Sequence, residues 1–151
     1  MNARSRSRLT DDDFTRLLAF RDGLRRFLHW SEAEAKAVGL TGAQHQLLLA
    51  IRGHRSDGDG GDGGGHAGAP SIGEVAEHLL LRHHSAVELV DRAQRSGLVD
   101  RVDDDADQRV VRLTLTAAGE AKLEALSAAH IEELSRLQSR FATLWDHLPV
   151  G

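Results

Sequence analysis

One predicted helical face, between residues 84 and 95, gathers side chains that could bind an anionic partner. Apolar residues recur there at helical spacing, and at about 100° per residue the opposite face is polar. The polar residues are His84, Ser85, Glu88, Asp91, Arg92 and Arg95. Guanidinium groups donate paired hydrogen bonds to carboxylates, phosphates and guanine edges. This face therefore favours recognition of a partner over the breaking of bonds.

The sequence contains no residue pattern that is typical of an enzyme. No phosphate-binding glycine loop opens a helix, and there is no nucleophile elbow or credible pair of catalytic carboxylates. Cysteine is absent, which excludes disulfides, thiolate metal ligands and cysteine nucleophiles. No two of the nine histidines have the i, i+4 spacing of a helical metal site, and Gly61 breaks the calcium-loop pattern of residues 57–69. We expect no catalysis, no cofactor and no metal.

Length and charge narrow the class of protein further. The 151 residues, 40% of them hydrophobic, suffice for one domain with a real core. The longest apolar run, Leu47 to Ile51, is far shorter than the roughly 20 residues of a membrane span, and no signal segment precedes it. We therefore expect a soluble, cytoplasmic protein. The net charge of −4 argues mildly against a nucleic-acid binder, although a small basic face would be enough.

The polar face must be positioned by other helices of the chain. Apolar residues at three- and four-residue spacing predict an amphipathic helix from Asp13 to about Val38. Capping-box spacings at Thr41 and Ser71 predict two further helix starts, the first helix ending near His54. The glycine-rich run between these two helices predicts a flexible loop.

A β-hairpin is predicted directly after the polar helix. Gly97 suits a left-handed helix cap, residues 98–102 and 109–115 read as strands, and residues 103–108 form a polar tip. Thr116 is placed to cap a long last helix with a continuous apolar seam, which usually meets another helix within the chain or across a dimer. The fold class is therefore mainly α with a small β-hairpin (α+β).

Short motifs in this order resemble those of the MarR family of winged helix-turn-helix transcription regulators. The match extends over roughly residues 40–126. Its motifs are Val75-Ala76-Glu77, Leu89-Val90-Asp91-Arg92, Ser96-Gly97-Leu98-Val99, Asp107-Gln108-Arg109, and Leu113-Thr114-Leu115-Thr116 with Gly119. One departure is Leu80-Leu81-Arg82, which stands where the family commonly has a Gly-Ile-Ser turn.

The resemblance implies one MarR-like domain over residues 1–151. Residues 10–38 and 116–148 would be dimerisation helices, residues 41–115 a winged-helix DNA-binding lobe, and residues 55–70 the flexible glycine-rich loop. The expected function is sequence-specific binding of double-stranded DNA, at a palindromic operator, by a homodimeric repressor that a small aromatic or other organic effector releases. Two alternatives stay open, a winged-helix module that binds protein and a metal-responsive regulator.

The resemblance also implies site residues. The helix near residues 84–96 would enter the major groove, and Arg109, oriented by a salt bridge to Asp107, would meet the minor groove. Glu88 could accept from cytosine or pair with Arg92, and we favour the pair. The effector pocket is expected at Phe27, Trp30, His45 and Leu48. The expected DNA contacts are Ser71, Arg82, His83, His84, Ser85, Glu88, Arg92, Arg95, Arg109 and Arg112.

Overall fold

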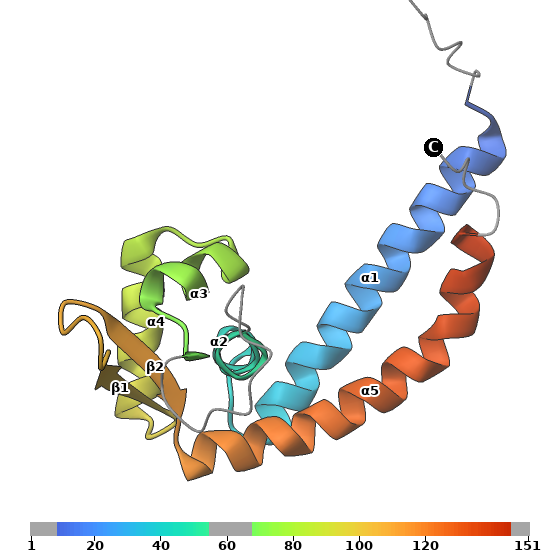
Figure 1. Ribbon diagram of the computed structural model, residues 1–151. Coiled ribbons are helices and arrows are strands. Elements are labelled where there is room, and N and C mark those ends of the chain that lie inside the picture. Colours follow the sequence, from blue (N-terminus) through green and yellow to red (C-terminus); the bar gives the residue numbers. More distant parts are fainter. Residues whose placement is uncertain (1–8, 55–67, 146–151) are drawn as a thin grey trace, which may run out of the picture.

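The protein is described by a computed structural model over residues 9–54 and 68–145, with only the backbone for residues 143–145. The described residues form five helices and one antiparallel hairpin (Figure 1), which confirms the expected fold class. The elements in chain order are α1 (Asp11–Ala37), α2 (Gly42–Gly53), α3 (Ile72–Leu79), α4 (His83–Arg95), β1 (Val99–Asp103), β2 (Val111–Leu115) and α5 (Ala117–Trp145).

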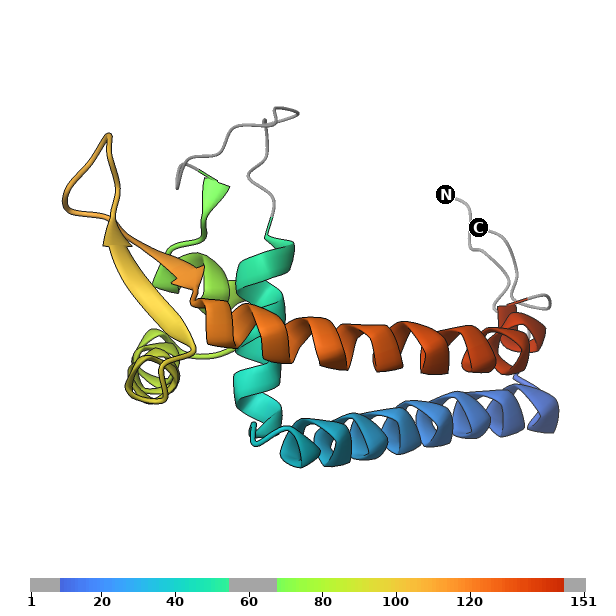
Figure 2. The same ribbon diagram turned by 90° about the horizontal axis from the view of Figure 1, so that it is seen from below.

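The elements divide into two parts that we call the arm and the lobe. The arm is the pair of long helices α1 and α5, which run side by side away from the rest of the molecule (Figure 2). The lobe comprises α2, α3, α4 and the hairpin, and α2 lies where the arm joins it. Helix α4 and the hairpin occupy the end of the lobe furthest from the arm in both views. The polar helix and the hairpin are thus presented together.

Three helices begin at capping boxes. Thr41 accepts a hydrogen bond from the Gln44 backbone N–H, and the Gln44 side chain accepts from the Thr41 N–H in return. Ser71 and Glu74 make the same reciprocal pair at the start of α3, so both predicted boxes are confirmed. A third box, Thr10 with Asp13, starts α1 and was not predicted. Each box satisfies two backbone donors that a helix start leaves unpaired.

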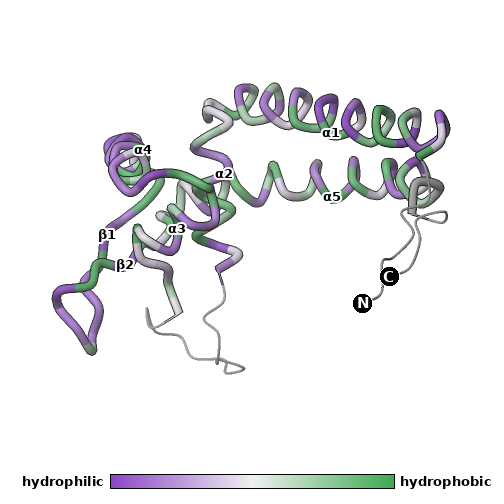
Figure 3. Tube along the Cα trace, turned by 90° about the horizontal axis from the view of Figure 1, so that it is seen from above, coloured by the Kyte–Doolittle hydropathy of each residue, from purple (hydrophilic) through white to green (hydrophobic). Residues whose placement is uncertain are grey.

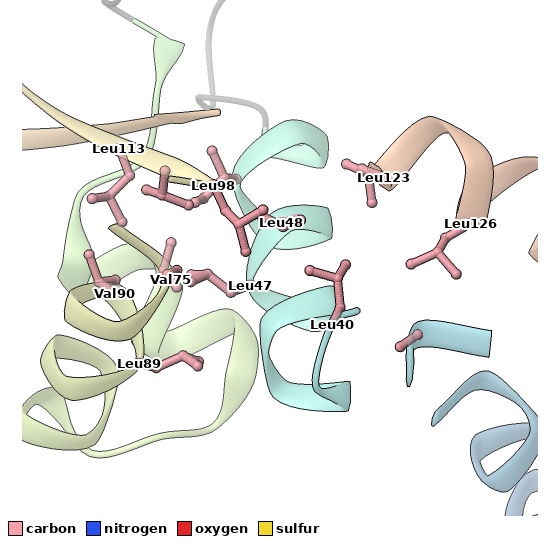
Figure 4. Packing of buried hydrophobic residues seen from close by; sticks show 14 residues of the cluster. Leu40, Leu47, Leu48, Val75, Leu89, Val90, Leu98, Leu113, Leu123 and Leu126 are labelled. Carbon is pink, nitrogen blue, oxygen red and sulfur yellow. The ribbon is translucent and has the colours of Figure 1, made fainter. Parts of the chain in front are cut away.

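The core of the lobe forms where α2 meets α3, α4 and the hairpin (Figure 4). Val75, Val90 and Leu113 are fully buried there, together with Leu47 from α2. Leu48, expected in an effector pocket, has an exposed fraction of 0% and belongs to this core instead. Burial of each such side chain contributes about 1.5–3 kcal/mol to the free energy of folding. The core therefore fixes α4 relative to α2.

The turn between α3 and α4 has unusual backbone geometry. Leu80 lies in the left-handed region with φ 54°, and its side chain is 94% exposed. The Leu81 N–H donates back to the Ala76 carbonyl at 2.9 Å, which closes the end of α3. Arg82 takes the N-cap position of α4 without a side-chain cap. A left-handed leucine is strained, because its Cβ crowds the following carbonyl.

The arm leaves many apolar side chains uncovered. Apolar and polar residues alternate along both arm helices (Figure 3), and Ala35 is the buried residue of α1. Within the arm, Gly23 lets the Phe141 ring approach α1 closely. No helix among residues 9–54 and 68–145 has both the length and the apolarity to span a membrane. The exposed large apolar residues of the arm are Phe14, Leu17, Leu18, Leu24, Leu28, Ile131 and Leu134.

The expected flexible loop, residues 55–70, lies mainly outside the described residues, which resume at Gly68. Its last two residues do not fit that expectation. Pro70 is fully buried and its carbonyl accepts the Leu113 N–H at 2.8 Å, while the Ala69 carbonyl accepts from Arg112 at 3.3 Å. These hydrogen bonds fix residues 69 and 70 against β2.

Gly119→Ala is expected to lower the free energy of unfolding by at least about 2 kcal/mol, because a bulky atom is forced into a packed site. A Cβ at Gly119 would lie 2.2 Å from the Leu98 carbonyl oxygen, so backbone would have to move. Urea unfolding followed by circular dichroism measures the change. Gly53→Ala is the control, since nothing lies within 4 Å of a Cβ there. Equal stability of the two variants would contradict the close approach.

Leu80→Gly is expected to raise the free energy of unfolding by about 0.5–1 kcal/mol, because glycine adopts a left-handed φ without strain. Little packing is lost, since the Leu80 side chain is almost fully exposed. Gly97→Ala is the matched reverse change, at φ +71° with nothing within 4 Å, and should lower stability by about 1 kcal/mol. Urea unfolding measures the stability of both variants. A loss of stability in Leu80→Gly would refute the strain assigned to Leu80.

Candidate nucleic-acid interface

Helix α4 presents the predicted polar face to solvent. Its buried residues are Ala86, Leu89, Val90 and Ala93, which is the predicted apolar stripe. Ser85 is half-buried, and the expected pair between Glu88 and Arg92 is not formed among the described residues. Both side chains are exposed, where such a pair would contribute little. The exposed members of the predicted set on or next to α4 are Arg82, His83, His84, Glu88, Arg92 and Arg95.

Arg101 of β1 ties the hairpin to α4. Its Nη2 lies 2.6 Å from Asp91 Oδ1, and its Nη1 donates to the Gln94 side chain. Asp91 is therefore engaged within the protein. Sequence reasoning missed Arg101, since the pairing joins a strand to a helix ten residues earlier and follows neither helical nor strand periodicity.

The hairpin tip holds Arg109 as predicted. Arg109 Nε and Nη2 donate to the two carboxylate oxygens of Asp107 at 3.0 and 3.2 Å, and the Arg109 backbone N–H also donates to Asp107. The guanidinium lowers the pKa of the Asp107 carboxyl. The Arg109 side chain is nevertheless 91% exposed. The tip thus presents an oriented guanidinium whose charge is partly balanced.

Arg112 lies in a different environment from the one expected of a DNA contact. Its Nε donates to Asp104 Oδ2 at 2.7 Å, and its Nη1 donates to Glu74 Oε2 at 3.2 Å. The side chain is only 22% exposed. Arg112 is the first cause of the lowered pKa of Asp104. Its donors therefore face the protein, because two carboxylates from α3 and the hairpin enclose it.

Ser71 is likewise engaged locally. Its Oγ accepts from the Glu74 N–H at the start of α3, and its own N–H donates to the Glu74 carboxylate at 2.7 Å. The bond from the Ser71 N–H is the main cause of the lowered pKa of Glu74. The role that the structure shows for Ser71 is that of a helix cap.

A hollow of about 510 Å³ lies between the arm and the lobe. Its walls include Leu28 and Ser31 of α1, His45 of α2, and Leu79 and Leu81 beside the α3–α4 turn. Of the four residues expected to line an effector pocket, His45 is the one on this wall. Leu48 lies in the core, and Phe27 and Trp30 pack in a neighbouring ring cluster, so none of these three residues borders this hollow.

Phe27 and Trp30 join a ring cluster where α1, α2 and α5 meet. The Trp30 and His45 rings each lie 4.7 Å from the His130 ring. His130 Nδ1 lies 2.7 Å from the Leu126 carbonyl, so this nitrogen donates, and Nε2 accepts from the Ser31 hydroxyl at 2.7 Å. Burial, followed by the nearby His130, lowers the pKa of His45. The cluster therefore favours a neutral His45.

Metal binding finds no ready site in the part of the chain that the structure describes. No group of three or more His, Asp or Glu side chains there could hold a metal ion. His54 and His78 do meet, with Nδ1 and Nε2 3.1 Å apart, and this distance is accounted for by a hydrogen bond between the rings.

The lobe is similar in sequence to known proteins. The family model of the MarR family matches residues 38–110. The uncharacterized HTH-type transcriptional regulator YsmB of Bacillus subtilis is 35% identical over 74 residues, 49% of this chain and 51% of that protein. The HTH-type transcriptional repressor MdtR of the same organism is 26% identical over 101 residues, 67% of this chain and 57% of that protein. The matches thus span about half the length of these relatives.

Solved structures of MarR-family proteins share the fold over most of the chain. The MarR family transcription regulator SP03579 has a TM-score of 0.68 at 21% identity, covering 89% of this chain and 80% of that one. A MarR family protein from Bacillus stearothermophilus gives 0.67 at 22% identity, with 86% and 82% covered. The Staphylococcus aureus MepR–DNA complex gives 0.62 at 20% identity, with 88% and 85% covered.

The stability of the protein is expected to fall as pH drops below about 6.5, because the unfolded chain takes up a proton that folded His45 resists. Above that pH the imidazole is neutral in both states, so His45 adds no pH dependence to stability there. His45→Gln should flatten this part of the profile. Urea unfolding between about pH 7.5 and 5.5 measures it.

His84→Gln, which alters an exposed histidine of α4, is the control and should leave the profile unchanged. If His45→Gln keeps the full slope of the parent protein, another group carries the pH dependence.

Proposed function

Because the chain contains the winged helix-turn-helix of the MarR family, we propose that it regulates transcription by binding a specific double-stranded DNA site as a homodimer. In this proposal it is a repressor that leaves its operator when a small organic effector binds. The name of MdtR, a transcriptional repressor, supports the proposed repression, and the MepR–DNA complex supports DNA as the partner.

The observation that carries the proposal is the joint placement of α4 and the hairpin. Both lie at the end of the lobe away from the arm (Figures 1 and 2). A single helix fits the major groove, about 12 Å wide, and a guanidinium suits the strong negative potential of a narrow minor groove. Arg109 is then the minor-groove residue. The residues of α4 and its N-cap that we propose contact DNA are Arg82, His83, His84, Ser85, Glu88, Arg92 and Arg95. Ser71, at the start of α3, is a further proposed DNA contact.

The acidic surroundings shape the expected affinity. Asp103 and Asp105 are exposed residues of the hairpin tip, and the whole chain has a net charge of −4. Such charges repel the DNA backbone, whose contacts supply most sequence-independent affinity. Binding should therefore depend mainly on the specific site, and nonspecific affinity should be modest.

The uncovered apolar residues of the arm support the homodimer. Leu17, Leu24 and Ile131 lie on helices that pack against each other and still leave these side chains in water. A second copy would bury such residues by two-fold symmetry. Two lobes would then face half-sites about one helical turn, roughly 34 Å, apart, which calls for a palindromic operator.

The hollow between arm and lobe supports an effector site. It touches α1, the start of α2 and the α3–α4 turn, so a molecule bound there would contact both parts of the protein. Its volume suits a small organic molecule, and its walls mix leucines with Ser31 and His45. A change in the angle between arm and lobe would move the two lobes of a dimer relative to the DNA.

The decisive experiment is selection of bound sequences from random duplexes, followed by affinity measurements on the selected site. A palindrome with half-sites about one turn apart is expected. Arg109→Ala should then weaken binding by about tenfold to a hundredfold and reduce the salt slope by about one.

Arg52→Ala on α2 is the matched control, since Arg52 is also exposed and paired, with Glu120 at 2.7 Å. It should bind as tightly as the parent protein, with both variants dimeric by sedimentation. Absence of any selected sequence, with the dimer intact, would refute the proposal and favour the protein-binding alternative. If the dimer stays bound to DNA in the presence of every small molecule tested, only the effector part of the proposal is refuted.

A further inference from the structure

Arg112 joins the hairpin to the helix-turn-helix. It lies on β2, and its Nε and Nη1 reach Asp104 in the hairpin and Glu74 in α3. Nη1 also donates to the Ala69 carbonyl. The guanidinium therefore joins the hairpin to the segment from Ala69 to Glu74 at the start of α3, and its rigid fork matches this geometry in a way that a lysine could not.

Asp104 carries the connection to the tip of the hairpin. Its Oδ2 accepts from Arg112, while its Oδ1 accepts the backbone N–H groups of Ala106 and Asp107 at 2.8 and 3.0 Å. Asp107 in turn holds the Arg109 guanidinium. Hydrogen bonds thus run without a break from Arg112 to Arg109.

Glu74 anchors the other end. It is the third residue of α3 and part of the capping box with Ser71, so its position is set by the start of that helix. One carboxylate oxygen, Oε2, accepts from both the Ser71 N–H and Arg112. The chain of contacts therefore begins at the helix-turn-helix itself.

We propose that Arg112 is a positioning residue, which sets the place of Arg109 relative to the helix-turn-helix and does not itself touch DNA. This inference rests on the proposed function, because Arg109 is the residue that meets DNA there. It replaces the direct DNA contact that the sequence alone suggested for Arg112. Without the clamp of Arg112, Asp104 and Glu74, the tip loses its fixed direction while the strands remain paired through their backbone.

A double-mutant cycle separates positioning from direct contact. Arg112→Gln should weaken binding to the selected duplex about tenfold in the parent protein, and should have almost no further effect when Arg109 is already alanine. A direct phosphate contact predicts the opposite, namely the same loss in both backgrounds and a lower salt slope. Additive losses would overturn the proposal.

Asp104→Asn provides a second variant should Arg112→Gln fold poorly. The amide keeps an oxygen for the tip N–H groups and loses the charge that faces Arg112, so it should reproduce the loss in binding. Arg52→Gln, which breaks an exposed ion pair with Glu120, should change nothing.

Hydrogen exchange of the Ala106 and Asp107 amides tests the clamp without DNA. Both should exchange faster in Arg112→Gln, while the core amide of Val90 stays protected. Unchanged exchange at the tip would overturn the clamp. If the amides respond and the parent protein binds no duplex, the clamp holds and the proposed function fails.

Discussion

Burial of the apolar face of α2 holds the arm and the lobe together. This helix contacts α1 and α5 on one side and α3, α4 and β2 on the other. Leu47 and Leu48 are fully buried, and α5 adds Leu123 and Leu126 to the same core. Because protein interiors are close-packed, a shift of α2 is felt by both parts at once.

The hairpin is attached by a different kind of force. Its two strands pair in register from Val99 with Leu115 to Asp103 with Val111, and Leu113 anchors them in the core. Beyond that anchor, ion pairs of Arg101 and Arg112 fix it to α4 and α3. Such pairs hold direction through hydrogen-bond geometry, and they contribute less to stability than the apolar core does. The direction of the hairpin tip thus depends on ion pairs, whereas the base of the hairpin depends on the apolar core.

Local signals in the sequence predicted most of the fold. The capping boxes at Thr41 and Ser71 depend on residues only three positions apart, and the left-handed Gly97 depends on its own residue type. Such local features can be predicted directly from the sequence. The Asp107–Arg109 pair is also local. The partners of Arg112 lie 8 and 38 residues away, and only packing brings them together. The hollow is likewise a product of how helices meet, so its lining could not be predicted from residues that are close in sequence.

The length of the arm turns it into a lever. Helix α1 has 27 residues, so at 1.5 Å per residue it extends about 40 Å from its junction with the lobe. A tilt of about 5° at that junction displaces a point at this distance by roughly 3.5 Å, close to the rise of one base pair. In the proposed dimer, a small rotation beside α2 would therefore suffice to take the two reading surfaces out of phase with the double helix.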